Sequence, residues 1–300
     1  MKHPETQFFT ESMSCSPPLL PGRIMVFITL LIILSSFGQE VCAEPRVFRV
    51  RDAKTVSFEQ MIDDLRKSSL VLVGETHNIE SHHRWQLDII EALNNSKTPL
   101  AVGFEMFIAE NQDELDRWVR GSLTIEEFIK AYYRNWSFPW PLYEAIFIYL
   151  RDNRIPAIGL NVPAEITQKI SKYGFSSLTR DELKKLPPET GCAVDEKYME
   201  FIRRAYSMHG HRQKQFIHFC EAQLIWDQVM ARNLVEYIKK NPQRTVIALT
   251  GNGHAWKRGI PEQVRSLSEK IRYKVILPGV SGYIDPGSVT SGDADYILFQ

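Results

Sequence analysis

Five short apolar runs, separated by longer stretches with helical periodicity, constrain the fold of this chain most. The runs cover residues 70–73, 100–104, 155–160, 245–249 and 274–277. Their apolar character is continuous rather than alternating, which is typical of strands that are covered on both faces. Regular alternation of such strands with helices predicts an α/β fold with three α/β/α layers and a mostly parallel sheet.

The stretches between the runs carry apolar residues at helical spacing. We expect helices over residues 83–93, 111–119, 124–132, 143–152 and 216–239. Residues 171–215 interrupt the alternation and contain two adjacent prolines and a glycine. We therefore expect a helical insertion at about 171–215.

The N-terminus has the features of a signal peptide. The apolar run Ile24–Leu34 is shorter than the ~20 residues of a membrane-spanning helix and has the length of a signal-peptide core. Val41 and Ala43 fit the small-residue rule for cleavage. These features predict a signal peptide over residues 1–43 and a mature chain that begins at Glu44.

Two other interpretations of the N-terminus stay open. An uncleaved segment would associate the protein with a membrane through its N-terminus. Lipid attachment at Cys42 is a further alternative, but Gln39, Glu40 and Val41 do not give the small-residue context that lipid attachment requires.

Composition excludes several classes of protein. The chain has 36 Lys+Arg and 36 Asp+Glu, and this balance argues against a nucleic-acid binder, which needs clustered positive charge. A hydrophobic content of 44% argues against intrinsic disorder. After residue 43 the cysteines are Cys192 and Cys220, which form neither a disulfide framework nor a zinc-finger spacing, and whether they pair stays open.

Polar residues follow four of the five apolar runs. Glu75 and His77 follow the first run, Glu105 the second, Asn161 the third and His254 the fourth. A single polar residue after a strand can simply be a helix cap or a surface residue. Polar residues at four strand ends are much harder to explain by coincidence. Because the carboxyl ends of parallel strands meet at one edge of a sheet, where ligands bind, we predict one polar site from these residues.

Common catalytic motifs are absent from the sequence. There is no His-Glu-x-x-His motif and no phosphate-binding Walker loop. The residues around Ser281 do not have the spacing of a nucleophile elbow. Catalysis by a serine or cysteine nucleophile therefore has no support in the sequence.

Five motifs, in this order, resemble the ChaN-like haem-binding proteins of the haem-uptake/Tiki superfamily. They are Gly74-Glu75-Thr76-His77 with His83 and Gln86, Gly103–Phe107, Ile155–Asn161, Trp226–Ala231 and Gly251-Asn252-Gly253-His254. The superfamily also includes Tiki metalloproteases and erythromycin-esterase-type hydrolases. The resemblance covers nearly all of residues 44–300 and implies one ChaN-like haem-binding domain there.

The resemblance also implies a function. It implies an exported protein, periplasmic or associated with the outer membrane, that serves haem or iron acquisition. Haem is then the expected ligand and cofactor, and a homodimer is a possible assembly. ChaN-like proteins are often lipoproteins, a feature that the residues before Cys42 do not support.

Residues 132–143 are rich in aromatic side chains and supply the candidates for haem contact. Tyr143 is the first candidate for an iron ligand and Tyr133 the second, because a phenolate favours ferric iron. Arg134 can pair with a propionate. His83 and His254 are further candidate haem contacts. The alternative for this segment is a hydrophobic corner that packs on the core.

A metal-dependent hydrolase of peptide or ester bonds is the alternative function. Glu75, His77, Glu105 and His254 would then hold a divalent metal ion or form the catalytic group, with a carboxylate orienting a histidine that activates water. Asp227 is a candidate to orient such a histidine. The pair His209 and His211 is another candidate haem or metal contact, although a surface histidine pair is more common.

Overall fold

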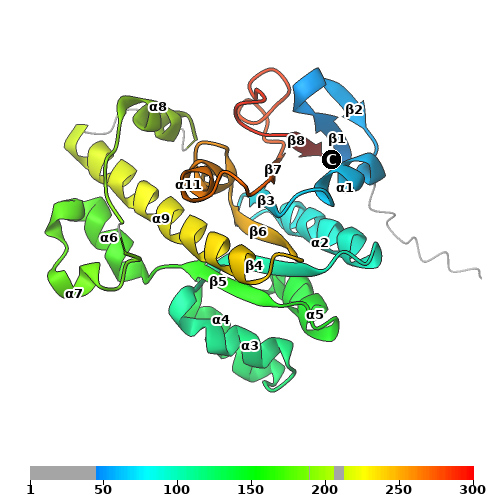
Figure 1. Cartoon of the computed structure of the whole chain (residues 1–300), viewed down its shortest axis with the longest axis horizontal. Helices are drawn as coiled ribbons and strands as arrows, with labels where there is room; N and C mark the ends of the chain where they lie inside the picture. The colour runs from blue at the N-terminus through cyan, green and yellow to red at the C-terminus, as the bar shows by residue number, and fades with distance from the viewer. Residues whose placement is uncertain (1–44, 189, 206–212) are drawn as a thin grey trace, which may run out of the picture. The chain divides into compact units, whose positions relative to one another are not determined.

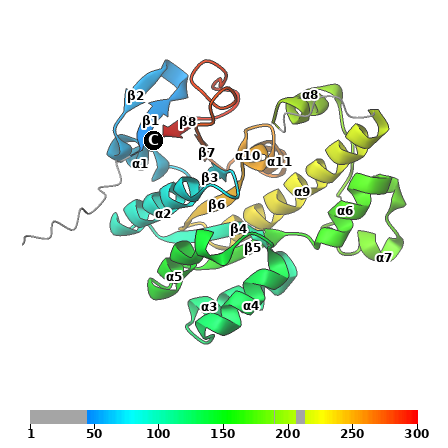
Figure 2. The ribbon, with the colours of Figure 1, turned by 180° about the vertical axis from the view of Figure 1, so that it is seen from behind.

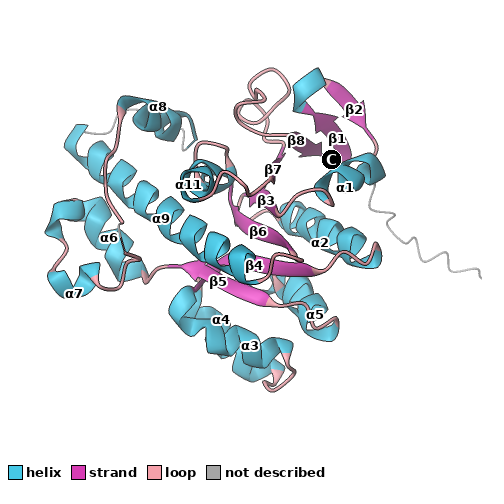
Figure 3. Cartoon of the chain, in the orientation of Figure 1, coloured by secondary structure: helices cyan, strands magenta, loops and turns pink. Residues whose placement is uncertain are grey.

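The computed structural model describes residues 45–188, 190–205 and 213–300. The predicted signal peptide and the pair His209 and His211 lie outside these residues. At the centre is an eight-stranded sheet with the strand order β2-β1-β8-β7-β3-β6-β4-β5 (Figure 3). The strands are β1 (Arg46–Arg49), β2 (Lys54–Val56), β3 (Leu70–Glu75), β4 (Leu100–Ile108), β5 (Ala157–Asn161), β6 (Thr245–Gly251), β7 (Tyr273–Pro278) and β8 (Tyr296–Phe299).

The five expected strands are β3 to β7, which together with β8 form the parallel part of this sheet. β3 lies between β6 and β7, and β4 lies between β5 and β6, all in parallel pairs. β8 is parallel to β7, whereas β1 pairs antiparallel with both β2 and β8. The prediction of a mostly parallel sheet is therefore confirmed, with an antiparallel edge that the apolar runs did not indicate.

Helices cover both faces of the sheet, which confirms the three-layer α/β/α fold. The first face carries α1 (Phe58–Leu65), α2 (Glu80–Asn95), α3 (Gln112–Val119), α4 (Ile125–Asn135) and α5 (Glu144–Asp152). The second carries α8 (Glu196–Ala205), α9 (Gln213–Lys240), α10 (Asn252–Ala255) and α11 (Ile260–Leu267). Figure 1 shows α9 and α11 in front of the sheet, and Figure 2 shows α2 and α5 from behind.

Shorter elements complete the chain. α6 (Ala164–Tyr173) packs against α9 through a third apolar cluster, and α7 (Arg180–Leu183) follows. Single 3₁₀ turns cover Val50–Asp52, Ala109–Asn111, Trp140–Leu142 and Phe175–Ser177. Within the described residues, no helix is long and apolar enough to cross a membrane.

The continuous apolar runs have a simple structural cause. In β3, Val71 and Val73 face the core under α2, while Leu70 and Leu72 face the core under α9. Successive side chains of a strand point to opposite faces, so a strand covered on both faces needs apolar residues at every position. Each fully buried side chain of this kind contributes about 1.5–3 kcal/mol relative to exposure.

Candidate functional site

A cavity of about 560 Å³ opens at the carboxyl ends of β3 and β6. It is lined by polar groups from the strand ends and by aromatic rings from the loop after α4, from α9 and from the loop after β7. The lining residues are Glu75, Thr76, His77, Glu105, Trp136, Phe138, Gln223, Trp226, Gly251, Asn252, Gly253, His254, Val280 and Tyr283.

Glu75 ends β3 and collects hydrogen bonds from two sides. Its Oε1 accepts from Nδ1 of His77 at 2.8 Å and from the hydroxyl of Tyr143 at 2.5 Å. Its Oε2 accepts from Nε2 of Gln86 at 2.8 Å and lies 3.4 Å from Nδ1 of His83. Both carboxylate oxygens are therefore occupied by groups of the protein itself.

These contacts set the protonation of the Glu75 group. Burial alone would raise the pKa of Glu75, but the hydrogen bonds to His77 and His83 outweigh it and hold that pKa well below its usual range. Burial lowers the pKa of His77, yet the carboxylates of Glu75 and Glu105 raise it overall. Burial and the charge of Glu75 raise the pKa of Tyr143 far above its usual range, so Tyr143 is a neutral donor.

Glu105 lies inside β4 rather than at its end, which corrects the expected strand boundary. β4 continues to Ile108, and its register with β5 shifts between Phe104 and Ile108. Oε2 of Glu105 accepts the backbone N–H of Gly251 at 2.6 Å. A Cβ on Gly251 would lie 3.1 Å from Cε1 of His77, so the glycine lets the imidazole lie close to β6.

His254 lies on α10, directly after β6, and is oriented from behind by Asp227 of α9. Nδ1 of His254 lies 2.7 Å from Oδ1 of Asp227, whose Oδ2 accepts the hydroxyl of Tyr198 at 2.8 Å. Nε2 of His254 lies 3.7 Å from Oε1 of Glu105. Burial raises the pKa of Asp227, and the charges of Glu105 and Asp227 raise the pKa of His254 against the effect of its burial.

The amino-acid sequence matches a known protein family. Residues 61–264 match the family described as haem-binding uptake, Tiki superfamily, ChaN. The chain belongs to this family. The match confirms the resemblance, and no curated protein matches the chain.

Solved structures are similar to the ChaN-family chain in fold. ChaN of Campylobacter jejuni, in a structure of cofacial haem binding, has a TM-score of 0.68 and 22% identity, over 86% of this chain and 97% of that one. An erythromycin esterase, a mutant of EreC in its open conformation, has a TM-score of 0.53 and 11% identity, over 84% of this chain and 97% of that one.

Several predicted site residues of the ChaN-family chain meet at the cavity. Glu75, His77, Glu105 and His254 all line it, although they come from β3, the loop after it, β4 and the short helix after β6. His83 lies buried behind Glu75. The amide of Asn161 donates to the backbone oxygen of Glu105 at 2.7 Å and so braces β4.

The three aromatic-segment candidates do not reach the cavity. Tyr143 is fully buried and donates to Glu75. Tyr133 is 50% exposed and accepts the N–H of Trp140, while Arg134 pairs with Glu114. The physical reason is that α4 runs to Asn135, beyond its expected end, so Tyr133 and Arg134 lie on a helix outside the cavity lining.

Residues 132–143 divide between the core and the cavity wall. Tyr132, Trp140 and Tyr143 pack into the core beneath the first face. Trp136 and Phe138 line the cavity, and each ring centroid lies 5.0 Å from that of His77. The aromatic wall of the cavity therefore comes from the middle of the segment.

Two aromatic lining residues, Trp226 and Tyr283, lie outside both the predicted site residues and the aromatic segment 132–143. Trp226 lies within a quoted motif on α9, and its ring centroid is 5.7 Å from that of His254. Tyr283 lies in the loop after β7, and burial raises its pKa to about 12. The loop follows the fifth apolar run. The expectation that ligands bind at the carboxyl ends of parallel strands, applied to this run as well, would have indicated this loop.

The four predicted metal ligands, Glu75, His77, Glu105 and His254, lie around one cavity but are not arranged as a metal site. Within the described part of the chain, no group of three or more His, Cys, Asp or Glu residues is placed to hold a metal ion. Both carboxylate oxygens of Glu75 already accept hydrogen bonds from side chains of the protein, so Glu75 is not available as a metal ligand in this arrangement.

Proposed function

We propose that this chain binds haem in the cavity at the strand ends, with Nε2 of His77 as the iron ligand. The observation that carries the proposal is an imidazole at an aromatic cavity, with its other nitrogen held by a buried carboxylate. Membership of the ChaN family supports haem as the ligand.

The hydrogen bond to Glu75 decides which nitrogen of His77 is available. A carboxylate acceptor places the ring proton on Nδ1, so the lone pair lies on Nε2. Histidines that bind metals commonly donate their other N–H to a carboxylate, which fixes the ring and raises its basicity. The His77 side chain is 27% exposed, so a ligand can approach it.

The cavity walls suit a large flat ligand with acidic substituents. Its volume of about 560 Å³ lies within the ~300–1,000 Å³ of ordinary ligand pockets. Trp136, Phe138 and Trp226 provide apolar contact area. His254 also lines the cavity, where its imidazole can form a hydrogen bond with a propionate.

Titration of haem-free protein with ferric haem tests the proposal through the absorption spectrum. We expect saturable binding with a histidine-type spectrum that is lost in His77→Ala. His218→Asn is the matched control, because His218 lies on α9 outside the cavity lining and should leave the spectrum unchanged. A tyrosinate-type spectrum that survives in His77→Ala and disappears in Tyr283→Phe would contradict the assignment of the ligand.

We extend the proposal to an exported protein of haem or iron acquisition, in the periplasm or at the outer membrane. The N-terminal sequence of the mature protein and its cell fraction test export. A product that begins near Glu44 supports a cleaved signal peptide, whereas one that retains Ile24–Leu34 indicates a membrane anchor. Sedimentation with and without haem tests the expected homodimer.

Hydrolysis of an ester or peptide bond is the second candidate, and the Asp227–His254 pair favours it. A histidine oriented through Nδ1 by a buried carboxylate can accept a proton from water at Nε2, which here faces Glu105. Ester hydrolysis that is abolished in His254→Ala but kept in His77→Ala would support this candidate. Haem binding without hydrolysis of any tested ester would exclude it.

A further inference from the structure

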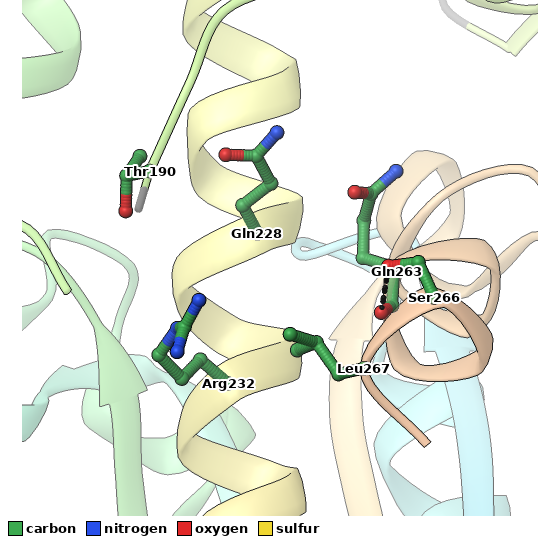
Figure 4. Close-up of a pocket in the computed structure, with 6 residues that line it drawn as sticks. All are labelled: Thr190, Gln228, Arg232, Gln263, Ser266 and Leu267. Atoms are coloured by element: carbon green, nitrogen blue, oxygen red, sulfur yellow. Dashed lines mark hydrogen bonds between the residues drawn. The ribbon is translucent and has the colours of Figure 1, made fainter. Parts of the chain in front are cut away.

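A second cavity, of about 130 Å³, lies outside the strand-end site (Figure 4). Figure 4 shows Gln228 and Arg232 projecting from successive turns of α9, and Gln263, Ser266 and Leu267 from α11. Thr190 completes the lining. None of these residues lines the strand-end cavity, so the two cavities have separate walls.

The second cavity contains a positive charge, and the described residues supply no countercharge to it. Arg232 is half-buried and makes no hydrogen bond or ion pair within the described ranges. Among the described residues, no carboxylate lines the cavity. Glu236, one turn along α9, is exposed and forms no ion pair with Arg232 in this part of the chain, while Glu262 pairs with Arg258 and Arg265.

The other polar side chains add hydrogen-bond donors. The side-chain amides of Gln228 and Gln263 form no hydrogen bond with described residues, so their NH₂ groups remain available. The hydroxyl of Ser266 donates to the backbone oxygen of Gln263 at 2.7 Å. Guanidinium and amide donors without a nearby carboxylate form a lining that suits a negatively charged ligand.

We infer that this cavity binds a small oxyanion, either a phosphate or a carboxylate, on the guanidinium of Arg232. A guanidinium presents two parallel N–H groups that match two oxygens of either anion. The cavity is too small for haem, so the ligand differs from that of the strand-end site. Gln228 directly follows Asp227 on α9, so the anion would bind on the same helix that orients His254.

Thermal unfolding of the haem-free full chain with inorganic phosphate, sodium acetate or sodium chloride at equal ionic strength tests the inference. A ligand at ten times its Kd should raise Tm by about 3–5 °C. We expect this rise with phosphate, acetate or both in the parent chain, and its loss in Arg232→Gln. Arg66→Gln is the matched control, because Arg66 is an exposed arginine on the opposite face.

Gln228→Glu provides a second variant if Arg232→Gln does not fold. It places a carboxylate in the cavity, which should repel the anion and occupy Arg232. A rise with phosphate alone assigns a tetrahedral oxyanion, and a rise with acetate assigns a carboxylate. Equal rises in the parent chain and both variants, an equal rise with chloride, or no rise with either anion would overturn the inference.

Discussion

The two carboxylate–histidine pairs at the strand-end cavity share a geometry but hold their charges differently. Glu75 is 2% exposed and Asp227 is 1% exposed. The distance from the carboxylate to Nδ1 of the histidine is 2.8 Å for His77 and 2.7 Å for His254. Burial and the distance to the paired histidine are therefore nearly the same, but Glu75 also lies 3.4 Å from Nδ1 of a second histidine, His83.

The pKa values of the two carboxyl groups nevertheless shift in opposite directions. Glu75 also accepts from Tyr143 and Gln86, and its pKa is lowered despite burial. Asp227 also accepts from Tyr198, but burial dominates and its pKa is raised. Glu75 has two histidines, His77 and His83, that lower its pKa, whereas Asp227 has only His254 and lies near the charge of Glu105, which raises its pKa. The charged neighbours, rather than burial, therefore set the direction of the shift in each pair.

Replacing the carboxylates should expose this difference most strongly. Glu75→Gln leaves the donors of Tyr143 and Gln86 facing an amide and should lower the free energy of unfolding by about 3–5 kcal/mol. Asp227→Asn should lower it by about 1–2 kcal/mol, because fewer donors lose a charged acceptor. Urea unfolding at neutral pH measures both values. Equal losses would show that the extra donors around Glu75 do not matter.

The histidines near the two pairs should give opposite pH dependence. His82 accepts the backbone N–H of Thr76, and burial, with the charge of His83, lowers its pKa from 6.5 to about 4. The unfolded chain then binds a proton that the folded chain excludes. Stability should therefore fall, by on the order of 2 kcal/mol, as pH decreases from about 6.5 to 4.

Variants separate this effect from the opposite contribution of His254. The pKa of His254 is raised, so its contribution is complete below pH 6.5 and is lost as pH rises through its folded-state pKa. His82→Asn keeps an acceptor for Thr76 and should reduce the loss of stability in acid. His254→Asn should instead reduce the loss at higher pH. Unfolding curves between about pH 4 and 8 measure both, and unchanged profiles would refute the assignments.

Much of the sheet could be predicted because a strand that is buried on both faces has a continuous apolar run in its own sequence. Each of β3 to β7 contains a continuous apolar run. β1 and β2 carry no such signal, since they are short strands with charged residues. Their place depends on a distant partner: Arg46 of β1 pairs with Phe299 of β8. Pairing across the whole chain cannot be inferred from a local pattern.

The candidate site also contains residues that a local pattern could place and residues that it could not. Glu75, His77 and His254 could be brought together from the sequence because parallel strand ends meet at one edge. Tyr143 and Arg134 could not be placed, because the end of α4 and the turn after it decide where these side chains point. Asp227 could be named from the sequence as a group that orients a histidine, but which histidine it reaches depends on how the long helix packs, and the structure pairs it with His254.

The smallest expected effect comes from removing one phenol hydroxyl on each side of the cavity. Tyr143→Phe removes a donor to a carboxylate that stays charged and should cost about 2 kcal/mol, whereas Tyr198→Phe should cost about 1 kcal/mol. Tyr149→Phe is the control, because its hydroxyl accepts from the neutral amide of Asn94. Urea unfolding of the three variants ranks them. If Tyr198→Phe costs more than Tyr143→Phe, Asp227 rather than Glu75 holds the more firmly charged carboxylate, and the contrast between the two pairs is reversed.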